Sequence, residues 1–156
     1  EYFDLDEKAD NHGDYKKKNS FELYELLKEK NILYAYNNLA YLYENYEYKK
    51  DINKALSLYE IAAKKGLANA MYKLGALYFF SKEIEQDHAK AYFWFSQASL
   101  KKHVKAQYCL GLLYEDGLGV EKNMEQAHKL YKISAFAGYK KAYKRLKELH
   151  KRDMEL

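Results

Sequence analysis

The chain has 156 residues, of which 48% are hydrophobic, and its 27 basic and 23 acidic residues give a formal net charge of +4. This length and hydrophobic content suit one domain with its own core, and no apolar run approaches the roughly 18 to 20 residues of a membrane-spanning helix. The single cysteine, Cys109, has no second thiol for an intramolecular disulfide, so cysteine content does not identify a compartment.

The first 19 residues have mixed charges and no regular apolar pattern, and we expect a loop, a degenerate helix or a partly disordered extension there. Residues 20–31 then show Phe21, Leu23, Tyr24 and Leu27 at helical spacing, which predicts half of an N-terminal repeat within one domain over residues 20–156. Because the chain begins at Glu1, we expect the native N-terminus to lie outside this sequence. The compartment, cytoplasmic or periplasmic, stays open.

From residue 35 onward the sequence repeats itself with a period of about 36 residues. Segments 35–69, 70–105 and 106–141 align with one another, and residues 142–146 open a fourth copy. Self-similarity at this period indicates a stack of like units. We therefore predict an all-α solenoid of about eight antiparallel helices, made of three full repeats between flanking half repeats.

Each unit begins with a helix, called helix A, whose apolar residues recur at spacings of three and four. These residues are Ala35, Leu39, Leu42 and Tyr43, then Ala70, Leu74, Leu77 and Tyr78, then Ala106, Leu110, Leu113 and Tyr114. Glycine inside a helix costs about 1 kcal/mol relative to alanine. Gly75 and Gly111 therefore predict places where another helix approaches closely, and Gly117 to Gly119 predict the end of the third helix A through a left-handed cap.

A second helix, helix B, follows in each unit after Asp51, Asp87 or Asn123, which are favourable N-cap residues. Its predicted buried residues are Ala55, Leu58, Tyr59 and Ala62, then Ala91, Trp94, Phe95 and Ala98, then Ala127, Leu130, Tyr131, Ser134 and Ala135. A last helix A, from Ala142 to about Arg152, is expected to turn Leu146 and Leu149 inward.

These positions, taken together, resemble the Sel-one-like repeat, a relative of the tetratricopeptide repeat. The third copy matches best, and the second has Ser81, Glu83 and Lys102 where the repeat has glycine. The resemblance covers roughly residues 20–152. It implies a bacterial protein-binding scaffold without catalytic activity, such as an adaptor, a regulator or an immunity-type inhibitor, whose partner is a protein or peptide.

No catalytic or cofactor-binding motif accompanies the repeats: HExxH, GxSxG, CxxC and phosphate-loop patterns are all missing. The five histidines lack the spacing of a zinc site, and we expect no metal and no cofactor. Two alternatives stay open. One is a cell-wall or β-lactam directed enzyme, as suggested for cysteine-rich relatives. The other is nucleic-acid or polyanion binding through residues 140–156, which carry seven basic and three acidic residues.

A binding surface is expected on the side of helix A opposite its buried residues, which lines the concave groove in tetratricopeptide-like arrays. The alternative is that these side chains pack between neighbouring helices. The candidate residues, rich in the aromatic side chains that anchor interfaces, are Asn37, Tyr41, Glu44, Tyr72, Phe79, Phe80, Tyr108, Leu112, Glu115 and Asp116. The oligomeric state is not indicated.

Overall fold

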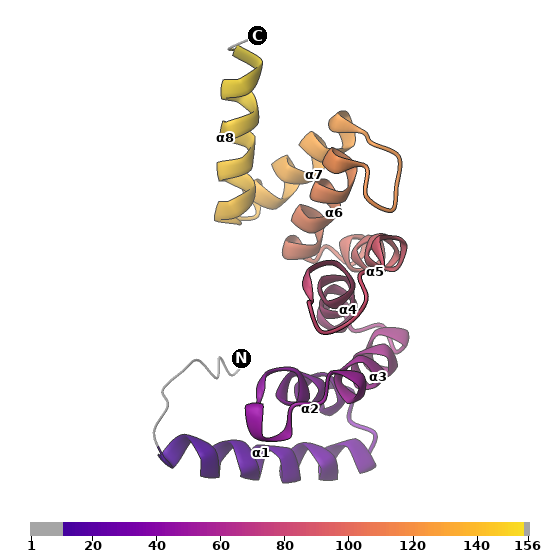
Figure 1. Cartoon of the computed structure of the whole chain (residues 1–156), viewed down its shortest axis with the longest axis vertical. Coiled ribbons are helices and arrows are strands. Elements are labelled where there is room, and N and C mark those ends of the chain that lie inside the picture. Colours follow the sequence, from indigo (N-terminus) through magenta and orange to yellow (C-terminus); the bar gives the residue numbers. More distant parts are fainter. Residues whose placement is uncertain (1–10, 155–156) are drawn as a thin grey trace. The chain divides into compact units, whose positions relative to one another are not determined.

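A computed structural model describes residues 11–154 of the chain, and within them it shows eight α-helices and one short 3-10 helix but no strand (Figure 1). The prediction of an all-α repeat fold is confirmed. The elements are α1 (Asn11–Glu29), α2 (Leu33–Asn45), η1 (Glu47–Lys49), α3 (Ile52–Lys64), α4 (Ala68–Phe80), α5 (His88–Leu100), α6 (Val104–Asp116), α7 (Met124–Phe136) and α8 (Lys140–Met154). None of these helices is long and apolar enough to cross a bilayer.

The chain divides into two compact units, residues 1–58 and 59–156. In the first unit α1 packs against α2, and the buried ring of Phe21 meets the rings of Tyr43 and Tyr46 at centroid distances of 5.1 and 5.6 Å. Helix α1 begins at Asn11, within the segment expected to be an extension. The expectation for residues 1–10 lies outside the described residues, and the domain boundary at residue 19 stays a prediction.

The second unit alternates helices of type A (α4, α6 and α8) with helices of type B (α5 and α7), each packed against the next along the chain. Its core is formed by the residues that recur in the repeat. Among the fully buried side chains are Leu74, Phe95, Leu113, Tyr131 and Leu149. In the predicted stripe of helix B, Trp94, Leu130 and Ala135 are half-buried and the other members are buried. Leu146 packs against the same core, as expected for α8.

Both helix A glycines of this unit lie where a helix B aromatic ring crosses. A Cβ atom added at Gly75 would come within 2.6 Å of the Phe95 ring, and one added at Gly111 within 2.5 Å of the Tyr131 ring. Atoms do not approach that closely without a shift of the neighbour. The prediction of close helix contacts at Gly75 and Gly111 is therefore confirmed.

The predicted helix boundaries follow from their caps. The side chains of Asp51, Asp87 and Asn123 accept backbone N–H bonds at 3.0, 2.9 and 3.0 Å at the starts of α3, α5 and α7. Gly117 ends α6 in the left-handed conformation, with φ 71°, and its N–H donates to the Leu113 carbonyl at 2.9 Å. These caps fix the lengths of the helices and the places where the chain turns.

The turns from helix B to the following helix A also share one conformation. Asn31, Gly66, Lys102 and Gly138 occupy equivalent places in successive turns, with φ angles of 57°, 96°, 61° and 90°. Glycine reaches this region without steric cost, whereas a lysine does so at a cost in energy. Lys102 therefore holds a backbone position suited to glycine.

Candidate protein-binding surface of helices α4 and α6

The candidate surface of the second unit consists of two rows on neighbouring helices of type A. Helix α4 contributes Tyr72, Ala76 and Phe80 at successive intervals of four residues, and α6 contributes Tyr108, Leu112 and Asp116 at the equivalent positions. Helices α4 and α6 contact each other, so the two rows lie side by side. Phe80 and Asp116 are exposed, and the other four residues are half-buried.

On α4 the aromatic side chains divide between packing and surface. The Tyr72 ring stacks on the His103 ring at 4.7 Å and lies 6.0 Å from the Phe95 ring. Phe79 meets the rings of Phe95 and His88 edge to face at 6.3 and 5.6 Å. Phe80 is 54% exposed and lies against Phe79 at 4.6 Å. Tyr72 and Phe79 therefore stabilise the unit as well as lining its surface, whereas most of the Phe80 ring faces solvent.

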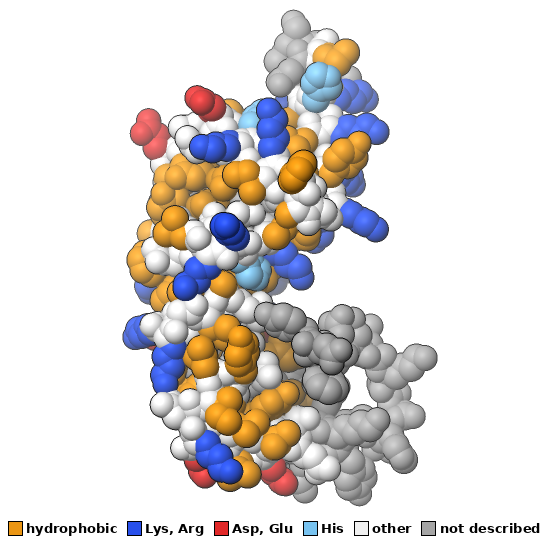
Figure 2. All heavy atoms as spheres, turned by 180° about the vertical axis from the view of Figure 1, so that it is seen from behind, with side chains coloured by type: hydrophobic (Ala, Val, Ile, Leu, Met, Phe, Trp, Pro, Cys, Tyr) orange, Lys and Arg blue, Asp and Glu red, His pale blue; other side chains and the backbone are white. Residues whose placement is uncertain are grey.

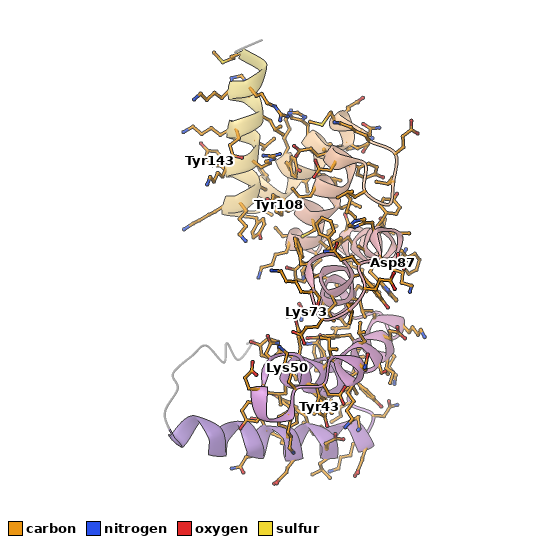
Figure 3. All side chains as sticks on the ribbon, viewed as in Figure 1. Tyr43, Lys50, Lys73, Asp87, Tyr108 and Tyr143 are labelled. Atoms are coloured by element: carbon orange, nitrogen blue, oxygen red, sulfur yellow. The ribbon has the colours of Figure 1, made fainter. Side chains whose placement is uncertain are left out.

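On α6 the row is partly covered by the last helix. The Tyr108 ring lies 5.6 Å from Tyr131 and 5.3 Å from Tyr139, and burial raises the pKa of its hydroxyl. Tyr108 and Leu112 both pack against the buried cluster that contains Tyr131, together with Leu146 of α8. Figure 3 shows Tyr108 on the side of α6 that faces α8, away from Asp87 at the start of α5. The α6 row therefore offers less apolar surface than the α4 row.

Glu115, expected at the rim, is instead 4% exposed and held in a fixed network. Its carboxylate accepts the Tyr131 hydroxyl at 2.7 Å and Arg145 Nε at 3.0 Å, and Arg145 Nη2 donates to its second oxygen. Burial acts to raise the Glu115 pKa, but the bonds from Arg145 and Tyr131 outweigh it and lower that pKa below its usual value. Glu115 thus joins α6, α7 and α8, and the exposed neighbouring carboxylate is Asp116.

The remaining candidates belong to α2 in the first unit. Asn37 is buried, Glu44 is half-buried and Tyr41 is 40% exposed. The Asn45 side chain donates to the Tyr41 carbonyl at 2.9 Å in the last turn of α2. Of these three residues, Tyr41 offers the most side-chain surface.

His103 caps α6 and Cys109 is buried in it. His103 Nδ1 caps α6 by accepting the Ala106 N–H at 3.3 Å, and burial followed by the charge of Lys105 lowers the His103 pKa. Cys109 is buried, which raises its pKa to about 12 and keeps the thiol protonated. Over residues 11–154 the structure shows no group of three or more His, Cys, Asp or Glu side chains able to hold a metal ion.

Two contributors to this region were not identified from the repeat pattern. Arg145 pairs with a residue thirty positions earlier, and helical periodicity does not predict pairs at that distance. The one available signal was that Arg145 and Arg152 are the only arginines of a lysine-rich chain. His103 caps a helix although histidine is not among the favoured N-cap residues.

Comparison with known proteins identifies the repeat. The chain matches the Sel1 repeat over residues 33–67, 68–103 and 104–143. A curated relative, DAP3-binding cell death enhancer 1 of Rattus norvegicus, is 36% identical over 96 residues, which are 62% of this chain and 18% of the rat protein. The chain thus spans less than a fifth of that relative's length.

Solved structures show the same architecture. A Sel1 repeat protein from Oxalobacter formigenes is 27% identical with a TM-score of 0.76, over 83% of this chain and 54% of that one. The Escherichia coli protective antigen c5321 is 30% identical with a TM-score of 0.74, over 78% of this chain and 26% of the antigen. Helicobacter pylori cysteine rich protein B, at 22% identity and a TM-score of 0.65 over 88% of this chain and 98% of that one, shares the fold. Proteins built from this repeat generally mediate protein–protein interactions. The three matched repeats and the alternating A and B helices place this chain in the Sel1 repeat family.

Proposed function

We propose that the chain is a non-enzymatic protein-binding module. Its partner, a protein or peptide, binds the α4 row and the exposed end of the α6 row, at Asp116. The observation that carries this proposal is Phe80, an aromatic ring 54% exposed at the end of a helix whose other large side chains are at least partly packed. Large aromatic side chains at the centre of an interface commonly supply most of its binding energy.

The surroundings of Phe80 favour this role because they are already ordered. Tyr72 is held between His103 and Phe95, so little side-chain entropy is lost when a partner covers it. Asp116, exposed at the equivalent end of α6, adds a negative charge that favours a partner segment with a basic residue. A basic segment with an apolar residue is thus the partner chemistry that suits this surface.

The relatives support the class of function. The rat relative, 36% identical over 96 residues, is named for binding DAP3. An adaptor, a regulator or an immunity-type inhibitor is the biological role proposed for this chain. Tyr41 of the first unit is proposed as a further contact on its own helix.

Site-specific photo-crosslinking tests the proposal. A photoreactive phenylalanine analogue is placed at Phe80 in the full chain, and at Phe93 as the control because that ring is 52% exposed on a helix of type B. We expect a discrete protein adduct from position 80 and none from position 93. The same adduct from position 93 alone would move the binding surface to α5 and contradict the proposal.

A further inference from the structure

Charge is distributed unequally between the two kinds of connection in the second unit. Each turn from helix B to helix A carries two adjacent exposed lysines: Lys64 and Lys65, Lys101 and Lys102, and Lys140 and Lys141. Residues 97–114 and 129–147 contain no acidic residue, whereas the loops from helix A to helix B contain Glu83, Glu85, Asp87 and Glu121. The turns around residues 101–102 and 140–141 are therefore rich in lysine and lie in stretches of sequence without acidic residues, whereas Lys64 pairs with Glu60 at 3.9 Å.

Helix electrostatics accounts for only some of these lysines. Cations are favoured at helix C-termini, which suits Lys101, but they are disfavoured at helix N-termini. Lys105 lies in the first turn of α6, and Lys140 and Lys141 begin α8. At these three positions the positive charge of lysine interacts unfavourably with the helix dipole.

Two large apolar side chains project from the same edge. Leu100 and Phe136 are the last residues of α5 and α7, at equivalent places in the repeat, and they are 78% and 98% exposed. Figure 2 shows hydrophobic and basic side chains adjoining on the surface of the second unit. Together these two side chains give the basic edge an exposed apolar component.

The two turns are neighbours in space. The Ser134 hydroxyl, two residues before Phe136, donates to the Val104 carbonyl at 2.9 Å. The rings of Tyr139 and Tyr108 meet at 5.3 Å close by. Residues 100–105 and 136–141 therefore form a continuous edge, which we name the lysine edge.

Lys102 adds an independent observation. It adopts φ 61° where the other two turns of the unit use Gly66 and Gly138. A non-glycine residue in this conformation reduces stability, and such strained positions cluster at functional sites. The strained position thus adds a positive charge to the lysine edge in place of the glycine that suits the backbone.

From this arrangement we propose that the lysine edge docks on an anionic lipid surface. Leu100 and Phe136 enter the boundary between headgroups and acyl chains, and Lys101, Lys102, Lys105, Lys140 and Lys141 bind the phosphate and carboxylate groups around them. Side chains at the tips of adjacent turns project outward and meet a broad surface together. A nucleic acid would satisfy the lysines but would leave Leu100 and Phe136 without an apolar environment.

The test uses the full chain and sonicated vesicles of pure phosphatidylcholine or of phosphatidylcholine mixed with phosphatidylserine. We expect sedimentation with the phosphatidylserine vesicles alone, weakening as salt is added. Replacing Lys101 and Lys140 with glutamine is expected to weaken binding about fivefold for each lysine. The matched control replaces Lys82 and Lys122, which are exposed in the opposite loops, and is expected to bind like the wild type.

Insertion is tested separately by tryptophan emission. In Phe136→Trp the added indole is expected to shift its emission to the blue on binding phosphatidylserine vesicles, and Phe136→Ser is expected to bind more weakly than Phe93→Ser. Circular dichroism checks that each variant is folded. Absence of vesicle binding, equal losses in the two lysine pairs, or binding without any emission shift would each overturn the proposal, and the last result would favour a soluble polyanion.

Discussion

Single residues decide how closely the helices of the second unit approach. Gly111 leaves room for the Tyr131 ring, which would otherwise lie 2.5 Å from a Cβ atom. The equivalent residue of α8, thirty-six positions later, is Lys147, which is exposed. The same place in the repeat is therefore tightly packed in α6 and open in α8.

Gly111→Ala is expected to destabilise the chain by about 1–3 kcal/mol because the added methyl group must displace the buried Tyr131 ring. At an uncrowded helix position the same change from glycine to alanine would instead raise stability by about 1 kcal/mol. Chemical denaturation measures the difference. Lys147→Ala is the control and should change stability by less than about 0.5 kcal/mol; a Gly111→Ala midpoint at or above the wild-type value would refute the close packing.

Lys102→Gly is expected to raise stability by about 0.5–1 kcal/mol, because it removes the strain of a lysine at φ 61° while adding some entropy to the unfolded chain. Lys101→Gly, at a neighbouring position with φ −86°, supplies the control and should lower stability. Thermal and chemical unfolding of both variants give the comparison. A loss of stability in Lys102→Gly would show that the backbone at this turn is not strained.

At the level of the helices, α8 packs its apolar residues on the core and also pairs with α6 through Arg145 and Glu115. Arg145 donates to the buried carboxylate of Glu115 and, at 3.2 Å, to Glu148 on its own helix. Removing the guanidinium would leave Glu115 buried without its counter-charge, which is the costly way to break such a pair.

Arg145→Ala is therefore expected to destabilise the chain by about 2 kcal/mol, a value reduced from that of a fully buried pair because the Arg145 side chain is 30% exposed. Hydrogen exchange should show the earliest loss of protection in α8. Lys147→Ala, an exposed residue of the same helix, is the control and should have little effect. If the double variant Glu115→Gln with Arg145→Ala is no more stable than Arg145→Ala, the explanation through an unpaired charge is wrong.

The start of α6 should respond to pH. His103 accepts the Ala106 N–H only when its Nδ1 is unprotonated, and its pKa is lower in the folded chain than in the unfolded one. Between the two values the unfolded chain binds more protons, so stability is complete above the unfolded pKa of about 6.5 and falls as the pH drops toward the folded value.

His103→Asn keeps a cap that does not titrate, so the part of the stability loss between about pH 6.5 and 5 that His103 causes should disappear. Urea unfolding at the two pH values checks this expectation. His128→Asn, which changes a histidine bonded to the Met124 carbonyl within α7, serves as the control over the same pH range. An undiminished loss in His103→Asn would exclude the cap as its source.

The sequence predicted the elements well because their signals are local. Asp87 and Asn123 mark helix starts because their side chains accept backbone N–H bonds there, and Gly117 marks a helix end through its left-handed backbone. Gly75 marked a helix contact through its missing side chain. The site was harder to predict. Periodicity identifies the side of helix A opposite the core, but it does not show that Glu115 is buried by Arg145 thirty residues away.

In the molecule as a whole, the repeats hold the candidate binding residues in place. Each unit is a packed framework, and in the second unit that framework presents Tyr72 and Phe80 on α4 beside the α6 row. A surface whose side chains are ordered before binding suits recognition of a protein partner, because little conformational entropy is then lost on association.

Titration calorimetry with the partner identified by crosslinking measures how much Phe80 contributes to binding. Phe80→Ala is expected to weaken the complex at least tenfold, or about 1.4 kcal/mol, while the unfolding midpoint stays within error of the wild type. Phe93→Ala is the matched control and should bind with wild-type affinity. An unchanged affinity in folded Phe80→Ala, together with a loss in Phe93→Ala, would contradict the account and place the partner on the helix B face.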